Sequence, residues 1–123
     1  IFENCKFKFV CPPQTLAGND NNKDWRSNLP KFINDIKNVG DFDIALVSCG
    51  GYGTPTVHYM YKKYNRSCVY IGGPLQLFFG VMGLRWRDNK IITSFKNRNS
   101  NYWIYPLNSD KPPYASKLIL IFS

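Results

Sequence analysis

The sequence predicts an α/β fold with a small, mostly parallel sheet. Two short apolar runs, residues 42–47 and 67–71, have the composition of buried strands, the first of them covered on both faces, and each is followed by a glycine-rich turn. A helical pattern follows each turn, so the order is strand, helix, strand, helix. Strands joined by a helical crossover pair in parallel, which places both glycine turns at the carboxyl edge of the sheet. Open α/β sheets bind ligands at this edge.

The length and composition predict one globular domain. A chain of 123 residues can bury a single core, and a hydrophobic fraction of 44% with 16% aromatic residues excludes a largely disordered protein. No apolar run is long enough to span a bilayer, and no signal peptide is recognisable. The chain starts at Ile1 without Met and already reads as a strand. We therefore expect a processed chain or a piece of a longer one.

The first third of the chain predicts a strand and a helix. Residues 6–10 alternate charged and apolar side chains, which is typical of a half-exposed strand. Apolar residues recur with helical spacing from Trp25 to Ile36. Pro30 interrupts this pattern, so we expect a helix that begins near Leu29 or is kinked there.

The rest of the chain predicts two more helices and a final strand. After the first glycine turn, Thr54 is a good N-cap and Pro55 fits the first helical position. Residues 75–79 begin the next helix, residues 84–105 are predicted to be irregular, and residues 118–122 form a last strand. The helix after Pro55 should bury a stripe of four side chains: Val57, Met60, Tyr61 and Tyr64.

Positive charge is concentrated in the second half of this basic protein. Residues 1–60 carry six basic and six acidic groups, whereas residues 61–111 carry nine basic groups and two acidic ones. Such a face suits phosphate, nucleotides, anionic glycans or nucleic acid, with general solubility as the alternative. Nucleic acid is the least favoured of these partners, because charge and aromatic content alone support it.

The cysteines do not predict a metal site. The chain has one His and no Cys-x-x-Cys pair, so the ligand spacing of a zinc site is absent. We expect reduced, buried thiols in a cytoplasmic protein, or in a virus particle if the source is viral. The four cysteines are Cys5, Cys11, Cys49 and Cys68.

The turn after residue 47 is the first candidate binding site. Gly51 and Gly53 resemble the start of a dinucleotide fingerprint, but Thr56 stands in the place of its third glycine. No acidic residue follows the next strand, so NAD is not favoured. A nucleotide or sugar phosphate at the helix start is favoured instead, with Gly51, Gly53 and Thr54 as donors. The alternative is a tight turn that holds no ligand.

Three titratable side chains are candidates for a catalytic base. His58 lies one turn into the helix after the glycine turn, and Asp20 and Asp24 precede the first helix. The alternatives are a packed or solvated histidine and solvated loop acids. Two arginines flank an aromatic ring at residues 85–87, and two aromatic rings follow an asparagine at residues 101–103, which suits stacking on sugars or bases, or an interface.

Several motifs in order resemble a known family. The most specific is the run at residues 72–86, which begins with two glycines, has Leu-Gln-Leu and two further glycines inside, and closes with Arg-Trp. The likeness extends over about residues 9–113 and is to the GT-D-like domain of predicted glycosyltransferases of bacterial surface-polysaccharide proteins. The other motifs are residues 13–19, 41–46, 49–53 and 102–106.

The resemblance implies a Rossmann-like, three-layer α/β domain over residues 1–123. It implies transfer of a sugar from a nucleotide-sugar donor to a glycan or another acceptor, with other subunits or the remaining domains of a longer chain as further partners. Arg85 would then hold the diphosphate leaving group. The implied binding residues are Gln14, Thr15, Gly18, Asn19, Gly50, Gly51, Gly53, Gly73, Gln76, Arg85 and Trp86.

The chain departs from the family pattern at three motif positions. Pro74 stands where a small residue is expected, Tyr70 where His is expected, and Tyr105 where Arg is expected. A domain with these changes can keep the fold without the reaction. The alternative function is therefore a non-catalytic structural or assembly protein, for example of a virus particle, whose basic face docks an anionic partner.

Overall fold

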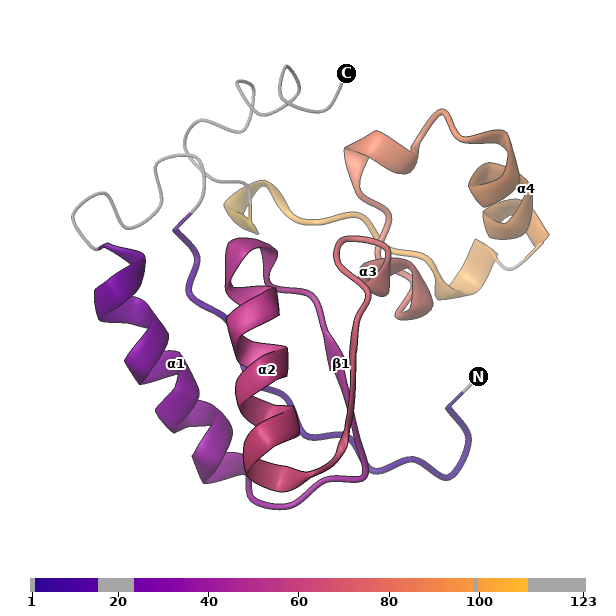
Figure 1. Cartoon of the computed structure of the whole chain (residues 1–123). Coiled ribbons are helices and arrows are strands. Elements are labelled where there is room, and N and C mark those ends of the chain that lie inside the picture. Colours follow the sequence, from indigo (N-terminus) through magenta and orange to yellow (C-terminus); the bar gives the residue numbers. More distant parts are fainter. Residues whose placement is uncertain (1, 16–23, 99, 111–123) are drawn as a thin grey trace. The chain divides into compact units, whose positions relative to one another are not determined.

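The chain divides into two compact units. The structure, a computed structural model, describes residues 2–15, 24–98 and 100–110. Unit 1 comprises the described residues up to Leu75, and unit 2 comprises those from Gln76 onward. The relative positions of the units are not determined, so each is described by itself (Figure 1).

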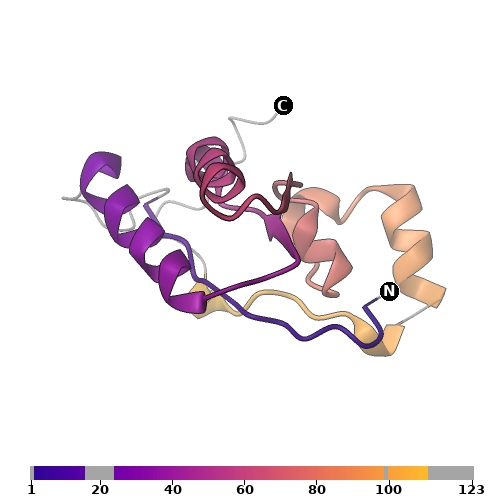
Figure 2. The same cartoon turned by 60° about the horizontal axis from the view of Figure 1, so that its bottom comes forward.

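Unit 1 is a mixed α/β structure built on a parallel pair of strands. Helix α1 (Trp25–Val39) is followed by β1 (Ile44–Val47), helix α2 (Gly53–Tyr64) and β2 (Ser67–Tyr70). The register runs from Ile44 opposite Ser67 to Val47 opposite Tyr70. The predicted α/β class and the parallel pairing are confirmed, and α1 and α2 lie beside each other in both views (Figures 1 and 2).

Helix α1 follows from its capping and its apolar spacing. The Asp24 side chain accepts a hydrogen bond from the Arg26 N–H at the first turn, and Gly40, with φ of 76°, ends the helix. Pro30 lies inside α1, so the helix starts earlier than the predicted start near Leu29. A proline in the second turn removes one backbone donor, and capping plus burial of the apolar face outweigh that loss.

The core of unit 1 is small and comes from four elements. Its buried residues are joined by ring and side-chain packing, with the centroids of the Phe32 and Tyr52 rings 6.4 Å apart in an edge-on arrangement. Val10, from the amino-terminal segment, also packs against this core. The five buried members are Phe32, Ile36, Val47, Tyr52 and Met60.

Three strand predictions are corrected. Residues 6–10 form no strand, because alternation supplies one apolar face but no ladder partner among the described residues. The two central strands are shorter than predicted and are not covered on both faces, since Ile44 is 55% exposed and Val69 44% exposed. The described sheet has two strands, and helices cover one face.

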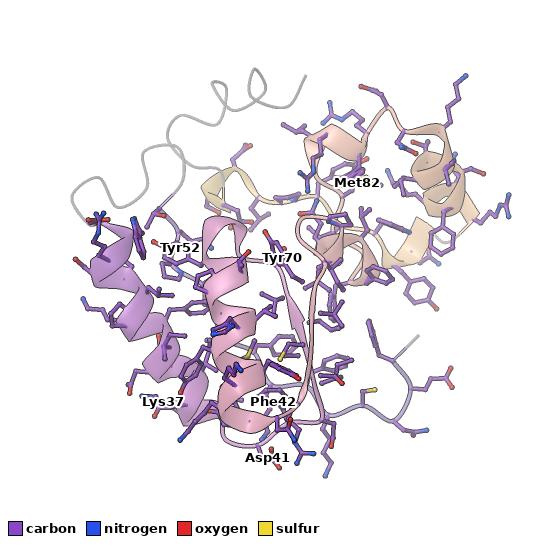
Figure 3. All side chains as sticks on the ribbon, viewed as in Figure 1. Lys37, Asp41, Phe42, Tyr52, Tyr70 and Met82 are labelled. Atoms are coloured by element: carbon purple, nitrogen blue, oxygen red, sulfur yellow. The ribbon has the colours of Figure 1, made fainter. Side chains whose placement is uncertain are left out.

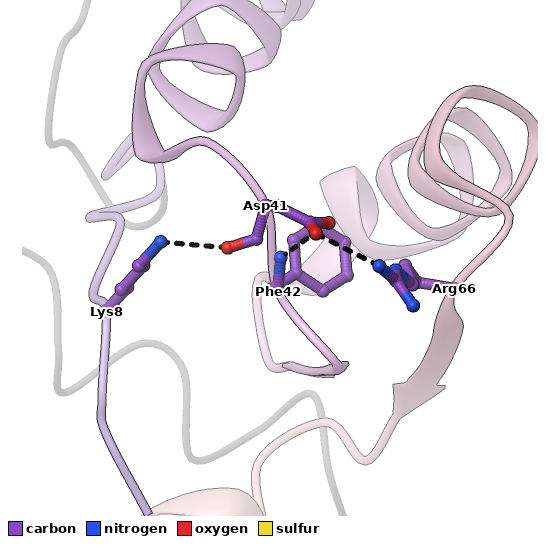
Figure 4. A network of polar contacts seen from close by, with 4 residues as sticks. All are labelled: Lys8, Asp41, Phe42 and Arg66. Atoms are coloured by element: carbon purple, nitrogen blue, oxygen red, sulfur yellow. Dashed lines mark hydrogen bonds and ion pairs between the residues drawn. The ribbon is translucent and has the colours of Figure 1, made fainter.

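A polar network fixes the connection between α1 and β1. The Lys8 ammonium donates to the carbonyl oxygens of Val39 and Asp41, at 3.1 and 2.8 Å. The Asp41 carboxylate accepts from the Phe42 N–H and from Arg66, each at 2.9 Å (Figure 4). The hydrogen bond from Arg66 and, to a smaller extent, the one from the Phe42 N–H hold the pKa of the Asp41 carboxyl below its usual value.

Unit 2 is held by short helical turns and one backbone bridge. Its elements are α3 (Leu75–Phe78), which begins at the end of unit 1, and α4 (Lys90–Arg98), with 3₁₀ turns at Leu84–Trp86, Ser100–Tyr102 and Asn108–Asp110. Val81 pairs in parallel with Ile104. The prediction of irregular structure over residues 84–105 is wrong, because the Asn89 side chain caps a helix there.

Some predictions lie outside the described residues. These include the last strand at residues 118–122 and the loop that holds Gly18, Asn19 and Asp20. Among the described helices, none combines the length and apolar character needed to cross a membrane.

Candidate functional site

The turn after β1 is helical almost from its start. Gly50, with φ of 51°, begins a 3₁₀ turn (Gly50–Tyr52) that runs directly into α2. The Tyr52 and Gly53 N–H groups donate to the carbonyls of Cys49 and Gly50. Thr54 is therefore the second residue of α2 and not its N-cap, which corrects the prediction. The Gly53 N–H, one of the expected phosphate donors, already has a partner.

The second glycine turn lies at the same edge of the sheet. The N–H groups of Ile71 and Gly72 both donate to the Val47 carbonyl, at 3.0 and 3.2 Å. Gly72 has φ of 69°, and its carbonyl accepts from the Leu75 N–H. The prediction that both turns share the carboxyl edge is confirmed, since these bonds hold the start of the second turn at the end of β1.

Tyr70 covers the first turn. Its hydroxyl donates to the Gly50 carbonyl at 3.0 Å, and its ring lies against Gly53 (Figure 3). A Cβ on Gly53 would lie 2.7 Å from Cζ of the Tyr70 ring. Glycine is therefore needed at this position for packing against Tyr70, independently of any bound phosphate.

A groove opens along the outer face of α2, beside this turn. It has a volume of about 370 Å³ and is lined by Tyr70 of β2 and four residues of α2. The four recur at helical spacing, which places them on one face. They are Thr54, Val57, His58 and Tyr61.

The groove changes the interpretation of α2. Tyr61 was expected in the buried stripe but is 56% exposed, whereas Thr56 is 1% exposed. Burial also raises the pKa of the Cys49 thiol, and an interaction with the Thr56 hydroxyl partly offsets this rise.

Among the groove residues, Tyr70 could have been placed beside α2 only from the pairing of its strand position with Val47. The repeat at residues 54, 57, 58 and 61 was the signal in the sequence.

Of the predicted catalytic residues, His58 lies in the groove and Asp24 does not. Asp24 caps α1 and forms an ion pair with Arg26 at 2.7 Å. Near the turn, the Thr15 and Tyr52 hydroxyls are 3.5 Å apart. The Gln14 amide donates to the Pro12 carbonyl at 3.2 Å, so it supports its own loop.

The remaining predicted binding residues belong to unit 2. A Cβ on Gly83 would lie 2.5 Å from Nε2 of Gln76, so these two motif residues pack closely. The Arg85 guanidinium lies 4.8 Å from the Trp86 ring centroid. The buried Trp86 Nε1–H has no hydrogen-bond partner among the described residues. The second wall of the expected donor site is thus a local cluster of unit 2.

The described residues contain no group of three or more His, Cys, Asp and Glu side chains that could hold a metal ion. All four cysteines are free thiols, and Cys5 and Cys11 are exposed, not buried.

Comparisons with protein-family models, with curated proteins and with solved structures gave no match. The geometry of the groove and its two turns is therefore the basis for assigning a function.

Proposed function

We propose that the protein is a glycosyltransferase-like domain of Rossmann-like architecture that binds a nucleotide-sugar donor at the carboxyl edge of β1 and β2. The observation that carries the proposal is the groove on α2, whose lining includes Thr54, next to the first glycine turn, and Tyr70, which hydrogen-bonds to that turn. Its volume of about 370 Å³ lies in the range of small-molecule sites.

The groove offers the contacts that a sugar or a base requires. Tyr61 and Tyr70 present aromatic rings for stacking, and both are about half exposed, at 56% and 46%. The Thr54 hydroxyl and the His58 imidazole add hydrogen-bonding groups at the amino-terminal end of α2, where the helix dipole favours the donor's phosphates.

His58 is the proposed general base. In the transfer, an acceptor hydroxyl oxygen bonds to the anomeric carbon, and the bond from that carbon to the donor's phosphate oxygen breaks. The bonding pair leaves with the nucleoside diphosphate, and the acceptor proton passes to His58.

Isothermal titration with nucleoside diphosphates and nucleotide sugars tests the donor site. We expect binding of at least one of them, weakened about five- to tenfold by Thr54→Val or His58→Gln, because each removes or alters one hydrogen-bonding group. Lys63→Ala is the control, since Lys63 is exposed on α2 but does not line the groove. Failure of every ligand to bind at millimolar concentration would overturn the proposal, as would parental affinity in both groove variants.

The non-catalytic alternative is favoured by one observation in unit 2. Several large apolar side chains there are well exposed, among them Ile91 at 79% and Leu107 at 68%, as expected of a surface that docks onto another subunit. Analytical ultracentrifugation, done alongside the titration, distinguishes the donor-binding function from the structural one. Self-assembly of the protein without nucleotide binding supports the structural role.

A further inference from the structure

A second groove lies on the polar face of α4, in unit 2. It has a volume of about 650 Å³ and opens between the end of the 3₁₀ turn at Leu84–Trp86 and the helix. Three cations and one carboxylate line it, with two hydroxyls and an amide. These residues are Arg87, Asp88, Lys90, Thr93, Ser94, Asn97 and Arg98.

Two of the three cations of this groove, Arg87 and Lys90, are not explained by the stability of α4, whereas Arg98 lies in the last turn, where the macrodipole favours a positive charge. Lys90 is the first residue of the helix, where the macrodipole disfavours a positive charge, and the first turn contains no acid. No ion pair joins Arg87, Lys90 or Arg98 to another residue in the described part of the chain, and Arg98 only donates to the Ser94 hydroxyl at 3.5 Å.

Lys96 shows the contrast within the same helix. Its ammonium lies 4.6 Å from the Tyr105 ring centroid and hydrogen-bonds to the Tyr105 hydroxyl, so it has a partner inside unit 2. The groove cations instead face solvent beside hydroxyl and amide groups. Together with Asp88, they give the groove lining a net charge of +2 (three cations less one carboxylate).

We propose that this groove binds the phosphodiester backbone of a nucleic-acid strand. Arg, Lys, Ser, Thr and Asn are the side chains that proteins use for phosphate contacts. The helix rises about 12 Å from Lys90 to Arg98, which separates the cations enough to contact more than one phosphate. The lining contains no aromatic ring, so the groove offers contacts to phosphates and no platform on which bases could stack. The site lies wholly in unit 2 and is independent of the donor groove.

Fluorescence anisotropy with a labelled 12-nucleotide oligo-dT, measured over a series of salt concentrations, tests this inference. With three phosphate contacts, a plot of the logarithm of the association constant against the logarithm of the salt concentration should have a slope of about −2. Arg87→Ala, Lys90→Ala and Arg98→Ala should each make the slope shallower by about 0.7. The three side chains are exposed, so the variants should keep the parental circular dichroism.

A charge-matched control separates this groove from general attraction. The double variant Lys62→Ala/Lys63→Ala removes two exposed charges from α2 and should leave the slope unchanged, whereas Arg87→Ala/Lys90→Ala should reduce it by about 1.4. Equal losses in the two double variants would overturn the proposal. It would also be overturned if pyrophosphate competed as well as oligo-dT, which would indicate a small phosphate ligand. Competition at equal charge by polygalacturonate would indicate an acidic glycan.

Discussion

Units 1 and 2 keep their structure by different means. Unit 1 buries five hydrophobic side chains from α1, β1, the 3₁₀ turn and α2 in one cluster. In unit 2, Met82 is the one hydrophobic residue among those described that is buried, at 2% exposure, and Ile91, Tyr102 and Leu107 are largely exposed. Unit 2 instead depends on backbone pairing around Val81 and Ile104 and on the Asn89 cap. A buried side-chain cluster therefore stabilises unit 1, whereas unit 2 combines local backbone geometry with less buried contacts such as the Phe95–Trp103 ring pair.

The largest effect should come from the core of unit 1. Phe32→Ala removes a ring that is 5% exposed and should lower the free energy of unfolding by about 3–5 kcal/mol. Urea unfolding followed by circular dichroism measures this loss. Phe9→Ala is the matched control, because Phe9 is 78% exposed and should change the value by less than about 0.5 kcal/mol. Similar losses in the two variants would contradict the placement of the core.

The next effect tests the backbone of unit 2. Gly80 has φ of 73°, and a Cβ there would collide with the Tyr102 carbonyl oxygen. Gly80→Ala should therefore break the hydrogen bonds that join residues 80, 82 and 104, each 2.8 Å long, and cost more than about 2 kcal/mol. Hydrogen exchange at the Met82 and Ile104 amides reports the loss.

Gly40→Ala is the control for Gly80→Ala. Gly40 has a similar φ of 76°, with ψ of −154°, but open space around its Cα, so its substitution costs backbone strain of about 1–3 kcal/mol and adds no collision. If the two variants were equally destabilised, contact with the Tyr102 carbonyl would not contribute to unit 2.

The smallest effect is electrostatic and belongs to unit 1. The hydrogen bonds from Arg66 and from the Phe42 N–H lower the pKa of Asp41. Their stabilisation is therefore present above the ordinary value of 3.8 and is lost as pH falls through the lowered pKa. Asp41→Asn should reduce the melting temperature at neutral pH. The difference in melting temperature between this variant and the parent should shrink below pH 4. Asp35→Asn, on the exposed side of α1, should show no such convergence.

The sequence was most informative where a pattern was long or strongly constrained. Helix α1 repeats its apolar spacing over 15 residues, so its buried face could be predicted despite Pro30. The parallel pairing followed from the order of two strands around one helix. Helix α4 was missed because Ile91, Ile92 and Phe95 lie among polar residues, and the cap at Asn89 was the remaining signal.

The donor groove shows why a site is harder to predict than a fold. The glycines at 50, 51 and 53 were expected to contact phosphate, but the position of Tyr70 over Gly53 depends on strand register, which local sequence does not encode. Thr54 and His58 could be singled out individually. Their association with Tyr61 and Tyr70 required the three-dimensional structure.

The packing of Tyr70 on Gly53 also constrains how this sequence can diverge. A side chain at position 53 and a phenol ring at position 70 cannot occupy the same space. Any homologue that has gained a Cβ at position 53 should therefore have a smaller residue, or a differently directed one, at position 70. The two positions are 17 residues apart and should covary as a pair, with the glycine retained wherever the tyrosine is retained.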